Sequence, residues 1–231
     1  INWSYVFIFI GCVIEIVLEI HMFKTASKWA VACVISLATL TVQAQDWVAG
    51  THYRVIASPM PTADTAKVEV VEAFGYWCPH CNAFEPMLAP WSKTLADDVS
   101  FENMPVVFSR SHELMARAYY VADLMGIKEA VHQPIYDALH LQRKRFRDAD
   151  DIADLFAEYG ANRDEVLKQM NSFAVNMKLK MGASRSKGYE VQGVPSMIVN
   201  GKYIVSASEA GSNANMLKVV EHLIAKERSA N

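Results

Sequence analysis

The chain contains few cysteines: four among 231 residues, namely Cys12, Cys33, Cys78 and Cys81. Only Cys78 and Cys81 lie close together in the sequence. A tetrahedral zinc site built on such a pair needs four ligands, and no second pair is present to complete it. His80 lies between the two cysteines, too close to both for comfortable chelation. We therefore expect no metal site.

An excess of positive charge is also missing. The chain has 22 lysines and arginines against 25 aspartates and glutamates, which gives a formal net charge of −3. A nucleic-acid-binding protein needs a basic stripe that neutralises phosphates, so nucleic acid is not expected as a partner. The one basic run, Arg143-Lys144-Arg145, is interpreted as a solvated loop between helices. Internal repeats and low-complexity segments are absent from the sequence as well.

Residues 22–44 have the pattern of a secretory signal. Met22 is a plausible start, lysines follow it, and an apolar stretch too short to span a bilayer comfortably ends in the small-residue pattern Val42-Gln43-Ala44. We expect the mature chain to begin at Gln45 and to be exported to the periplasm, an oxidising compartment in which disulfides persist. Removal of the signal on export would leave Cys78 and Cys81 as the only cysteines of this mature chain.

Residues 1–21 precede this signal, and they allow two interpretations. They are either upstream translation from a misplaced start or a genuine membrane segment. We favour the first, because a complete signal begins at Met22 and because Glu15 and Glu19 would be costly inside a bilayer. In both cases the part of the chain after the signal faces the export side.

The order of the expected elements indicates an α/β fold. Val68–Phe74 is nearly continuously apolar and predicts a strand buried on both faces, and Asn82–Ala96 predicts an amphipathic helix. The other expected strands are 47–56 (an edge strand or extended arm), 101–108, 196–199 and 202–206. Helical spacing fills most of 111–189, and a last helix is expected at 214–228. Asn200-Gly201 is a strong signal for a two-residue hairpin. Strand, helix, strand, helical segment, hairpin and helix together indicate a thioredoxin-like fold over 45–231 with a helical insertion at about 110–180.

The Cys78-Pro79-His80-Cys81 motif lies at the junction between the first buried strand and its helix. Two cysteines separated by two residues at such a junction are typical of thiol–disulfide exchange. The first cysteine meets unpartnered backbone N–H groups and the positive end of the helix dipole, which stabilise its thiolate. A purely structural disulfide is disfavoured, because closing so short a loop removes little entropy from the unfolded chain.

The sequence resembles the DsbA family of periplasmic thiol:disulfide oxidoreductases over essentially all of residues 45–231. The resemblance rests on Glu72 six residues before Cys78, on the Cys78–Cys81 motif and on Phe84-Glu85 after it. It continues in Gly193-Val194-Pro195 and in the run 199–203. Thioredoxins share the fold but usually carry Gly-Pro between their cysteines.

This resemblance implies a protein dithiol oxidase. The Cys78–Cys81 disulfide would be the redox group, with no other cofactor, and it would be donated to unfolded or reduced exported proteins. A DsbB-like membrane oxidase would restore it. Nothing in the sequence suggests an obligate dimer, so a monomer is expected.

Each residue of the motif has an expected role. Cys78 is expected to be the exposed nucleophile and Cys81 the buried partner that re-forms the disulfide. Pro79 suits the first helical turn, where its missing N–H costs nothing. His80 can give a hydrogen bond or positive charge to the Cys78 thiolate, and stabilising the reduced form in this way makes the disulfide a stronger oxidant.

Val194 and Pro195 are the candidate substrate-binding residues. The resemblance implies a cis Val194–Pro195 peptide bond lying against the cysteines. The Val194 backbone would then offer its N–H and C=O to an extended substrate peptide. The alternative is an ordinary trans proline that opens a strand.

Glu72 lies in the middle of an otherwise apolar strand, where a lone carboxylate is costly without a partner or a task. The resemblance implies a buried acid that assists proton movement at Cys81; the alternative is an edge residue paired to a lysine. Some members of the family place a lysine near this acid on the next core strand, but here the corresponding position is Asn103, so the acid would be less well compensated.

Two other functions stay open: a disulfide isomerase or reductase, and a non-catalytic binding or assembly factor on the same fold. Isomerases usually add a dimerisation domain, and none fits between Gln45 and Cys78. The intact motif argues against a pure binding protein. Tyr76 and Trp77 could rim a hydrophobic patch for unfolded chains. His112, His132 and His140 are interpreted as ordinary surface or core histidines.

Overall fold

The computed structural model describes residues 46–230. The expected secretory signal at 22–44, the segment 1–21 and the cysteines at 12 and 33 lie outside the described residues. Within residues 46–230, no helix combines the length and the apolar character needed to cross a membrane.

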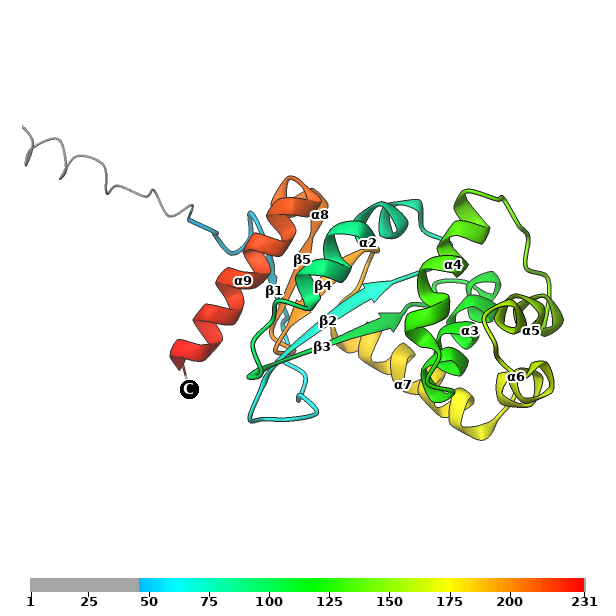
Figure 1. The fold of residues 1–231 in the computed structure, drawn as a ribbon. Coiled ribbons are helices and arrows are strands. Elements are labelled where there is room, and N and C mark those ends of the chain that lie inside the picture. Colours follow the sequence, from blue (N-terminus) through cyan, green and yellow to red (C-terminus); the bar gives the residue numbers. More distant parts are fainter. Residues whose placement is uncertain (1–45, 231) are drawn as a thin grey trace, which may run out of the picture. The chain divides into compact units, whose positions relative to one another are not determined.

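A five-stranded sheet forms the centre of the described region, with strand order β1-β5-β4-β2-β3 (Figure 1). All seven residues of the central strand β2 are buried, as its continuous apolar pattern predicts. Strand β2 pairs in parallel with β3 and antiparallel with β4. The strands are β1 (Arg54–Val55), β2 (Val68–Phe74), β3 (Val99–Pro105), β4 (Ser196–Val199) and β5 (Tyr203–Ser206).

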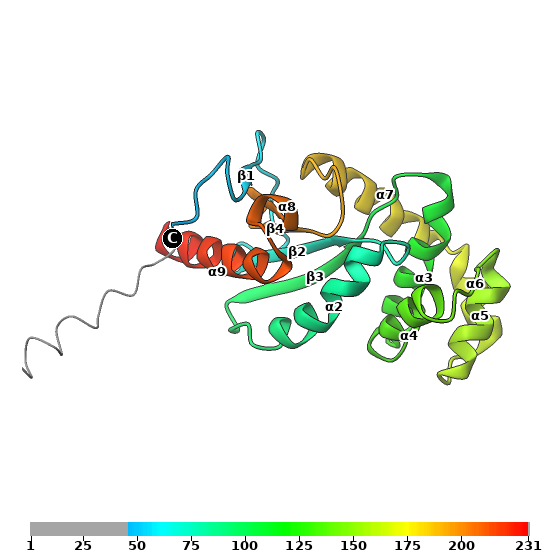
Figure 2. The ribbon, with the colours of Figure 1, turned by 90° about the horizontal axis from the view of Figure 1, so that it is seen from above.

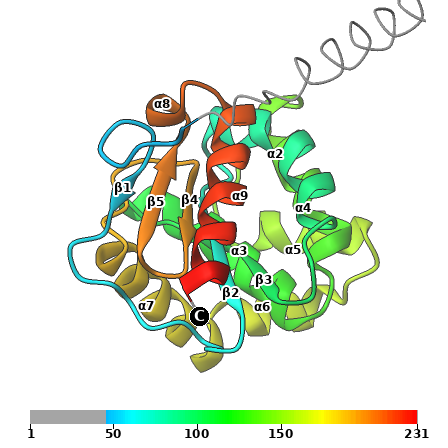
Figure 3. The same ribbon diagram turned by 90° about the vertical axis from the view of Figure 1, so that its left-hand side faces the viewer.

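Helices cover both faces of this sheet. Helices α2 (Pro79–Ser92) and α9 (Asn213–Ala230) lie over one face, where Phe84 and Leu223 share an apolar cluster with Val70 (Figure 3). On the other face, Tyr189 packs against a second cluster that contains Val71 and Ile198 from the sheet. Helix α7 (Phe173–Gly188) approaches this side (Figure 2). The sheet is therefore the middle layer of three.

The helical segment between β3 and β4 has a core of its own. It lies beyond the ends of β2 and β3 (Figure 1), and its cluster reaches back to include Phe74 and both cysteines of the motif. Capping residues fix several helix starts, because Asp148, Asn162 and Ser172 each accept the N–H of the residue three positions on. The remaining elements of the segment are η1 (Arg110–His112), α3 (Glu113–Leu124), α4 (Lys128–His140), α5 (Ala149–Glu158) and α6 (Arg163–Met170).

Several expectations about the elements were wrong. The helix expected over 82–96 spans Pro79–Ser92 as α2. The strand expected over 47–56 is confined to Arg54–Val55, because a turn closed by the Gly50 N–H on the Tyr53 carbonyl (2.8 Å) interrupts it. Strand β3 begins at Val99, two residues early, since Val99 pairs with Val68, and it ends at Pro105. The short helix α8 (Ala207–Ala210), capped by Ser206, was not expected.

The hairpin predicted at Asn200-Gly201 is confirmed. Asn200 (φ 51°) and Gly201 (φ 61°) both adopt the left-handed conformation of a type I′ turn. Gly201 is also required by space, because a Cβ atom there would lie 2.2 Å from the Met60 carbonyl oxygen. This tight turn sets the register in which β4, the strand that follows Pro195, pairs with β5.

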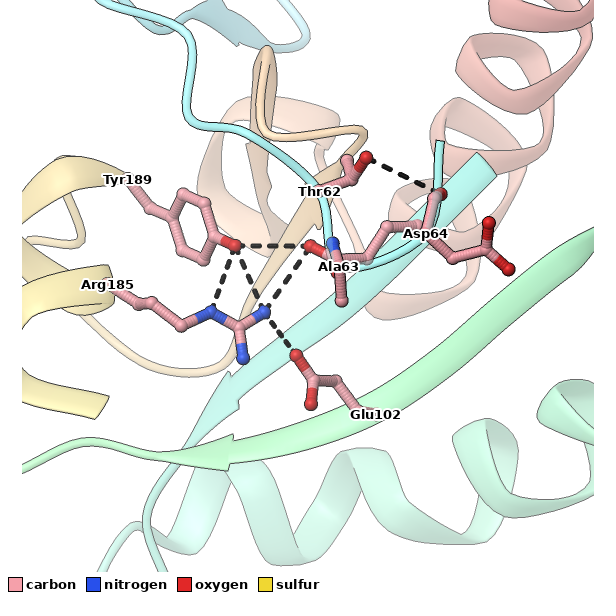
Figure 4. Close-up of polar contacts among 7 residues, drawn as sticks. Thr62, Ala63, Asp64, Glu102, Arg185 and Tyr189 are labelled. Atoms are coloured by element: carbon pink, nitrogen blue, oxygen red, sulfur yellow. Dashed lines mark hydrogen bonds and ion pairs between the residues drawn. The ribbon is translucent and has the colours of Figure 1, made fainter. Parts of the chain in front are cut away.

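An ionic cluster around the buried Glu69 carboxylate joins α7 to the sheet and to the loop before β2 (Figure 4). Arg185 on α7 donates to Glu69 on β2 (3.3 Å) and forms an ion pair with Glu102 on β3. Glu69 also accepts from the Tyr189 hydroxyl (3.2 Å) and from the Ala63 N–H (3.2 Å). Because the Glu69 side chain is only 6% exposed, these bonds replace the hydrogen bonds that water would otherwise make to the carboxylate.

We predict that Arg185→Met lowers the free energy of unfolding by about 2–3 kcal/mol, because it leaves the Glu69 carboxylate buried without its cation. Urea denaturation of the oxidised protein measures the loss. The matched control is Arg163→Met, whose guanidinium pairs with Asp150 and Asp154 at the surface; its loss should stay below about 1 kcal/mol. Equal losses in the two variants would show that the cluster does not join α7 to the sheet.

Candidate functional site

Cys78 is the N-cap residue of helix α2, with Pro79 at the first helical position. A turn closed by the Cys78 N–H on the Gly75 carbonyl (2.9 Å) brings the chain from β2 into this position. No side chain caps the helix. The free N–H groups of its first turn therefore face the sulfur, in the place where Ser, Thr or Asp side chains usually accept such bonds.

The surroundings of Cys78 favour its ionised form. Its pKa is lowered from the ordinary value of 9.0 to about 6. The largest cause is a hydrogen bond from the Cys81 thiol, and the backbone N–H groups of Cys81 and His80 and the charge of His80 add to it. Burial acts in the opposite direction. A thiolate at neutral pH is the state that attacks a disulfide or departs from one.

Cys81 is placed to behave in the opposite way. It is 0% exposed, and its pKa is raised by burial, by its hydrogen bond to Cys78 and by the nearby Glu72 carboxylate. Both residues are free thiols in this structure. The pair therefore consists of one readily ionised sulfur and one sulfur that holds its proton.

The expectation that Cys78 is exposed was wrong, since only 4% of the residue is accessible. Trp77 and Val194 pack against the apolar cluster that contains both cysteines. The Cys78 Sγ lies 3.4 Å from the Val194 carbonyl oxygen, to which its thiol donates. His80, by contrast, is exposed beside it.

The Val194–Pro195 peptide bond is cis, as the resemblance implies. The Val194 backbone thereby meets Cys78, and the Ser196 hydroxyl donates to the Gly193 carbonyl (2.8 Å) within the same loop. A groove of about 480 Å³ runs from this loop past His80. Its other lining residues are Arg54, Gln192, Ser206, Ala207, Ser208, Glu209 and Asn213.

Glu72 is fully buried on β2, directly opposite Asn103 on β3. The Asn103 amide donates to its carboxylate (2.7 Å), which confirms that Asn103 is the neighbour on the next core strand. Burial, followed by the charge of Glu85, raises the pKa of Glu72 from 4.5 to about 8. No lysine or arginine among residues 46–230 forms an ion pair with it, so the alternative of an edge residue paired to a lysine was wrong.

Several residues of the site were missed in the sequence. Tyr76 is 1% exposed and forms part of the core rather than a surface rim. Its hydroxyl lies 2.6 Å from His132 Nδ1, and its carbonyl lies 2.7 Å from His140 Nε2. His112 stacks on the Trp77 ring with centroids 3.9 Å apart.

The sequence held one signal for this arrangement. His132, Tyr136 and His140 follow one another at a spacing of four, so they share one face of α4. What that face contacts depends on the packing of α4 against the turn before Cys78, which the spacing does not reveal.

Known proteins that are similar in sequence point to one family. A profile described as a DSBA-like thioredoxin domain matches residues 92–218, more than half of the chain. The DsbA of Pseudomonas aeruginosa is 36% identical over 201 residues, covering 87% of this chain and 95% of that protein. The DsbA of Pseudomonas syringae pv. tomato is 40% identical over 196 residues, covering 84% and 92%. The chain belongs to the DsbA family.

Solved DsbA structures agree with this assignment. The crystal structure of Pseudomonas aeruginosa DsbA superposes with a TM-score of 0.78 at 37% identity, covering 81% of this chain and 97% of that one. DsbA from Xylella fastidiosa superposes with a TM-score of 0.75 at 30% identity. The thioredoxin-like α/β fold predicted from the sequence is thus confirmed. The DsbA relatives are named thiol:disulfide interchange proteins, and thiol–disulfide exchange is the activity of this chain.

We predict that Cys81→Ala raises the pKa of Cys78 more than His80→Ala does, because the Cys81 thiol is the largest cause of the low pKa and the His80 charge is a smaller one. Thiolate absorbance near 240 nm, followed through a pH titration of the reduced proteins, measures both changes. His222→Ala, an exposed position on α9, serves as the control and should leave the titration unchanged. A larger effect of His80→Ala would mean that charge, and not the thiol hydrogen bond, dominates.

Proposed function

We propose that this protein is a dithiol oxidase and that Cys78 and Cys81 form its redox pair. The observation that carries the proposal is the contrast between the two sulfurs at the start of α2. A thiolate of the reduced substrate protein attacks Cys78 Sγ, the Cys78–Cys81 bond breaks, and Cys81 takes up a proton. A second substrate thiolate then attacks the substrate sulfur of the mixed disulfide, and Cys78 departs as a thiolate. The substrate loses two electrons and the pair gains them.

The low pKa of Cys78 makes the pair more oxidising. At pH 7, a thiol of pKa about 6 is roughly nine-tenths ionised, whereas an ordinary thiol is about one per cent ionised. This difference favours the reduced form about tenfold, which corresponds to about 30 mV for a two-electron couple. The direction supports an oxidase over a reductase, because a stabilised reduced form makes the disulfide easier to donate.

Val194 and Pro195 are proposed to hold the substrate. The Val194 carbonyl oxygen lies 3.4 Å from Cys78 Sγ, so an extended peptide that pairs with this backbone would bring its own cysteine to the nucleophile. The groove beside His80 continues from the same loop and offers hydroxyl and amide groups to the rest of the peptide.

The biological setting is also a proposal. We infer that the substrates are unfolded or reduced exported proteins and that the protein acts in the periplasm. A DsbB-like membrane oxidase would return the pair to the disulfide. The predicted secretory signal and the family's activity support this setting, since a protein that donates disulfides requires a compartment in which they persist.

Glu72 is proposed to assist the release of Cys81. Its pKa of about 8 keeps the carboxyl protonated at neutral pH, and the negative charge that Glu72 gains when it loses this proton raises the pKa of Cys81. A protonated acid at this position can give its proton to the departing Cys81 sulfur, which has a strongly raised pKa and therefore retains the proton.

We predict that the pair, equilibrated in glutathione buffers and followed by tryptophan fluorescence, is more oxidising than glutathione. Above pH 6 the reduced pair binds one proton instead of two, so its potential should fall by about 30 mV per pH unit, against about 59 mV below pH 6. Cys81→Ser should accumulate a mixed disulfide with substrate, and Cys78→Ser should form none. A couple well below glutathione would refute the oxidase, and a slope of about 59 mV per pH unit throughout would refute the low pKa of Cys78.

Glu72→Gln should stabilise the oxidised protein increasingly as the pH rises from about 4.5 to about 8. In this window the carboxyl has lost its proton in the unfolded chain but keeps it in the folded protein. The free energy of unfolding of the wild type is therefore lowered by an amount that grows with pH, up to about 5 kcal/mol. Urea denaturation across this pH range measures the gain. Glu129→Gln, at an exposed site on α4, should show no comparable trend. A flat difference for Glu72→Gln would mean that Glu72 is ionised at neutral pH.

A further inference from the structure

Four buried polar atoms beneath the cysteine pair have no hydrogen-bond partner among the described residues. They are Glu72 Oε1, Glu85 Oε2, His132 Nε2 and Tyr136 OH. Buried polar groups are nearly always hydrogen-bonded, so four in one neighbourhood require an explanation. Glu85 Oε2 and His132 Nε2 lie 3.5 Å apart and face each other. Tyr136 packs edge-on against His132 with ring centroids 5.4 Å apart, and Glu85 lies close enough to Glu72 for its charge to help raise the pKa of Glu72. The four residues therefore form one cluster.

The His132 ring is held in a defined orientation. Tyr76 OH lies 2.6 Å from His132 Nδ1, and burial raises the pKa of Tyr76 well above its ordinary value, so this hydroxyl keeps its proton. The hydroxyl has no other partner among the described residues and therefore donates to Nδ1. The neutral ring then carries its proton on Nε2, the nitrogen that faces Glu85. Phe74, Tyr119 and Tyr136 pack edge-on around the ring and fix its plane.

The cluster reaches solvent only at its outer end. Glu72 is 0% exposed, whereas the side chains of Glu85 and His132 are 10% and 13% exposed. The titratable groups that face His132 are Tyr76 from the turn before α2, Glu85 from α2, Tyr119 from α3 and Tyr136 from its own helix; the ammonium of Lys128 lies over the Tyr119 ring at 5.9 Å. Asn103, the direct partner of Glu72, has an amide that neither releases nor takes up a proton at these pH values.

We propose that His132, together with Glu85, carries protons between solvent and the buried Glu72. When substrate breaks the Cys78–Cys81 bond, the Cys81 sulfur takes the proton of the Glu72 carboxyl, and Glu72 becomes a carboxylate. The His132–Glu85 pair then returns a proton to Glu72, and water at the exposed edge restores the proton of the pair. Reoxidation runs the same path in reverse. Tyr76 acts as the positioning residue that fixes the ring nitrogen bearing the proton.

This inference rests on the proposed role of Glu72, and His132→Asn tests it. An asparagine oxygen can still accept the Tyr76 hydroxyl, but the amide cannot carry a proton. Reduction of the oxidised protein by excess dithiothreitol, followed by stopped-flow tryptophan fluorescence between pH 5 and 8, should become about three- to tenfold slower, with an altered pH profile. Imidazole added at constant pH should restore much of the rate, which a purely structural role would not allow. His222→Asn, exposed on α9, should react as the wild type does.

Two outcomes would overturn the proposal: a His132→Asn rate and pH profile equal to those of the wild type, or a slower rate that imidazole does not restore. If His132→Asn fails to fold, His132→Gln, whose amide nitrogen can reach the position of Nε2, is measured with the same expectation. Glu72→Gln in the same assay distinguishes the role of Glu72 from that of the His132–Glu85 pair. A normal rate for Glu72→Gln refutes the role of Glu72 itself, whereas a slow Glu72→Gln beside a normal His132→Asn refutes only the relay.

Discussion

The chemistry depends on the stabilisation of the Cys78 thiolate at the start of α2, to which the Cys81 thiol contributes most and the free backbone N–H groups of the helix add. Every α-helix begins with N–H groups that lack partners within the helix, and α5, α6 and α7 satisfy one of theirs with Asp148, Asn162 and Ser172. Helix α2 has a cysteine in that position and no side-chain cap. The N–H groups thus become a binding site for negative charge, and the charge that fits is the Cys78 thiolate. A structural requirement common to all helices is thereby turned into a redox property.

The cysteine pair also depends on what lies behind it. Cys81 is buried against the cluster of the helical segment, which keeps its proton in place. That segment contacts the motif through α4, where His132 and His140 bind the side chain and the carbonyl of Tyr76. At the opposite side of the sheet, Arg185 ties α7 to β2 and β3. The helical segment therefore contributes to the site from two directions, and its contacts with β2 hold the strand from which the motif emerges.

Charge is distributed unequally around the site. Glu72 and Glu85 bring two carboxyl groups into an apolar region, and no lysine or arginine among residues 46–230 forms an ion pair with Glu72. Such a pair is stable because at least one member keeps its proton, which creates a store of protons next to a sulfur that must be protonated and deprotonated in each cycle. A lysine at position 103 would have neutralised Glu72 by charge. With an asparagine there, the Glu72 charge is removed by protonation of the carboxyl, and His132 on α4 supplies the proton.

The main features of the fold could be predicted from local patterns. The continuous apolar run Val68–Phe74 indicated a central strand, and Asn200-Gly201 indicated the hairpin, because both signals depend on neighbouring residues. The edge strand near residue 50 was overestimated, since a turn at Gly50 competes with strand pairing and only the arrangement of β5 decides the outcome. The same limit applied to the site. Cys78, Cys81, Val194, Pro195 and Glu72 could be named, but not the burial of Cys78 or the histidines around Tyr76.

The sequence by itself therefore determined the reactive pair, the helix that it caps and the order of the elements, because these follow from adjacent residues and the periods of helix and strand. The tertiary structure decided how each titratable group behaves. The pKa of Glu72 depends on burial and on Glu85 and Asn103, which are distant in the chain. The pKa of Cys78 is lowered by its neighbours His80 and Cys81, and the burial that opposes this shift comes from the folded core. His132 is 56 positions from Tyr76, and no local pattern specifies that contact. It exists because α4 packs over the turn before α2, which is a property of the folded core.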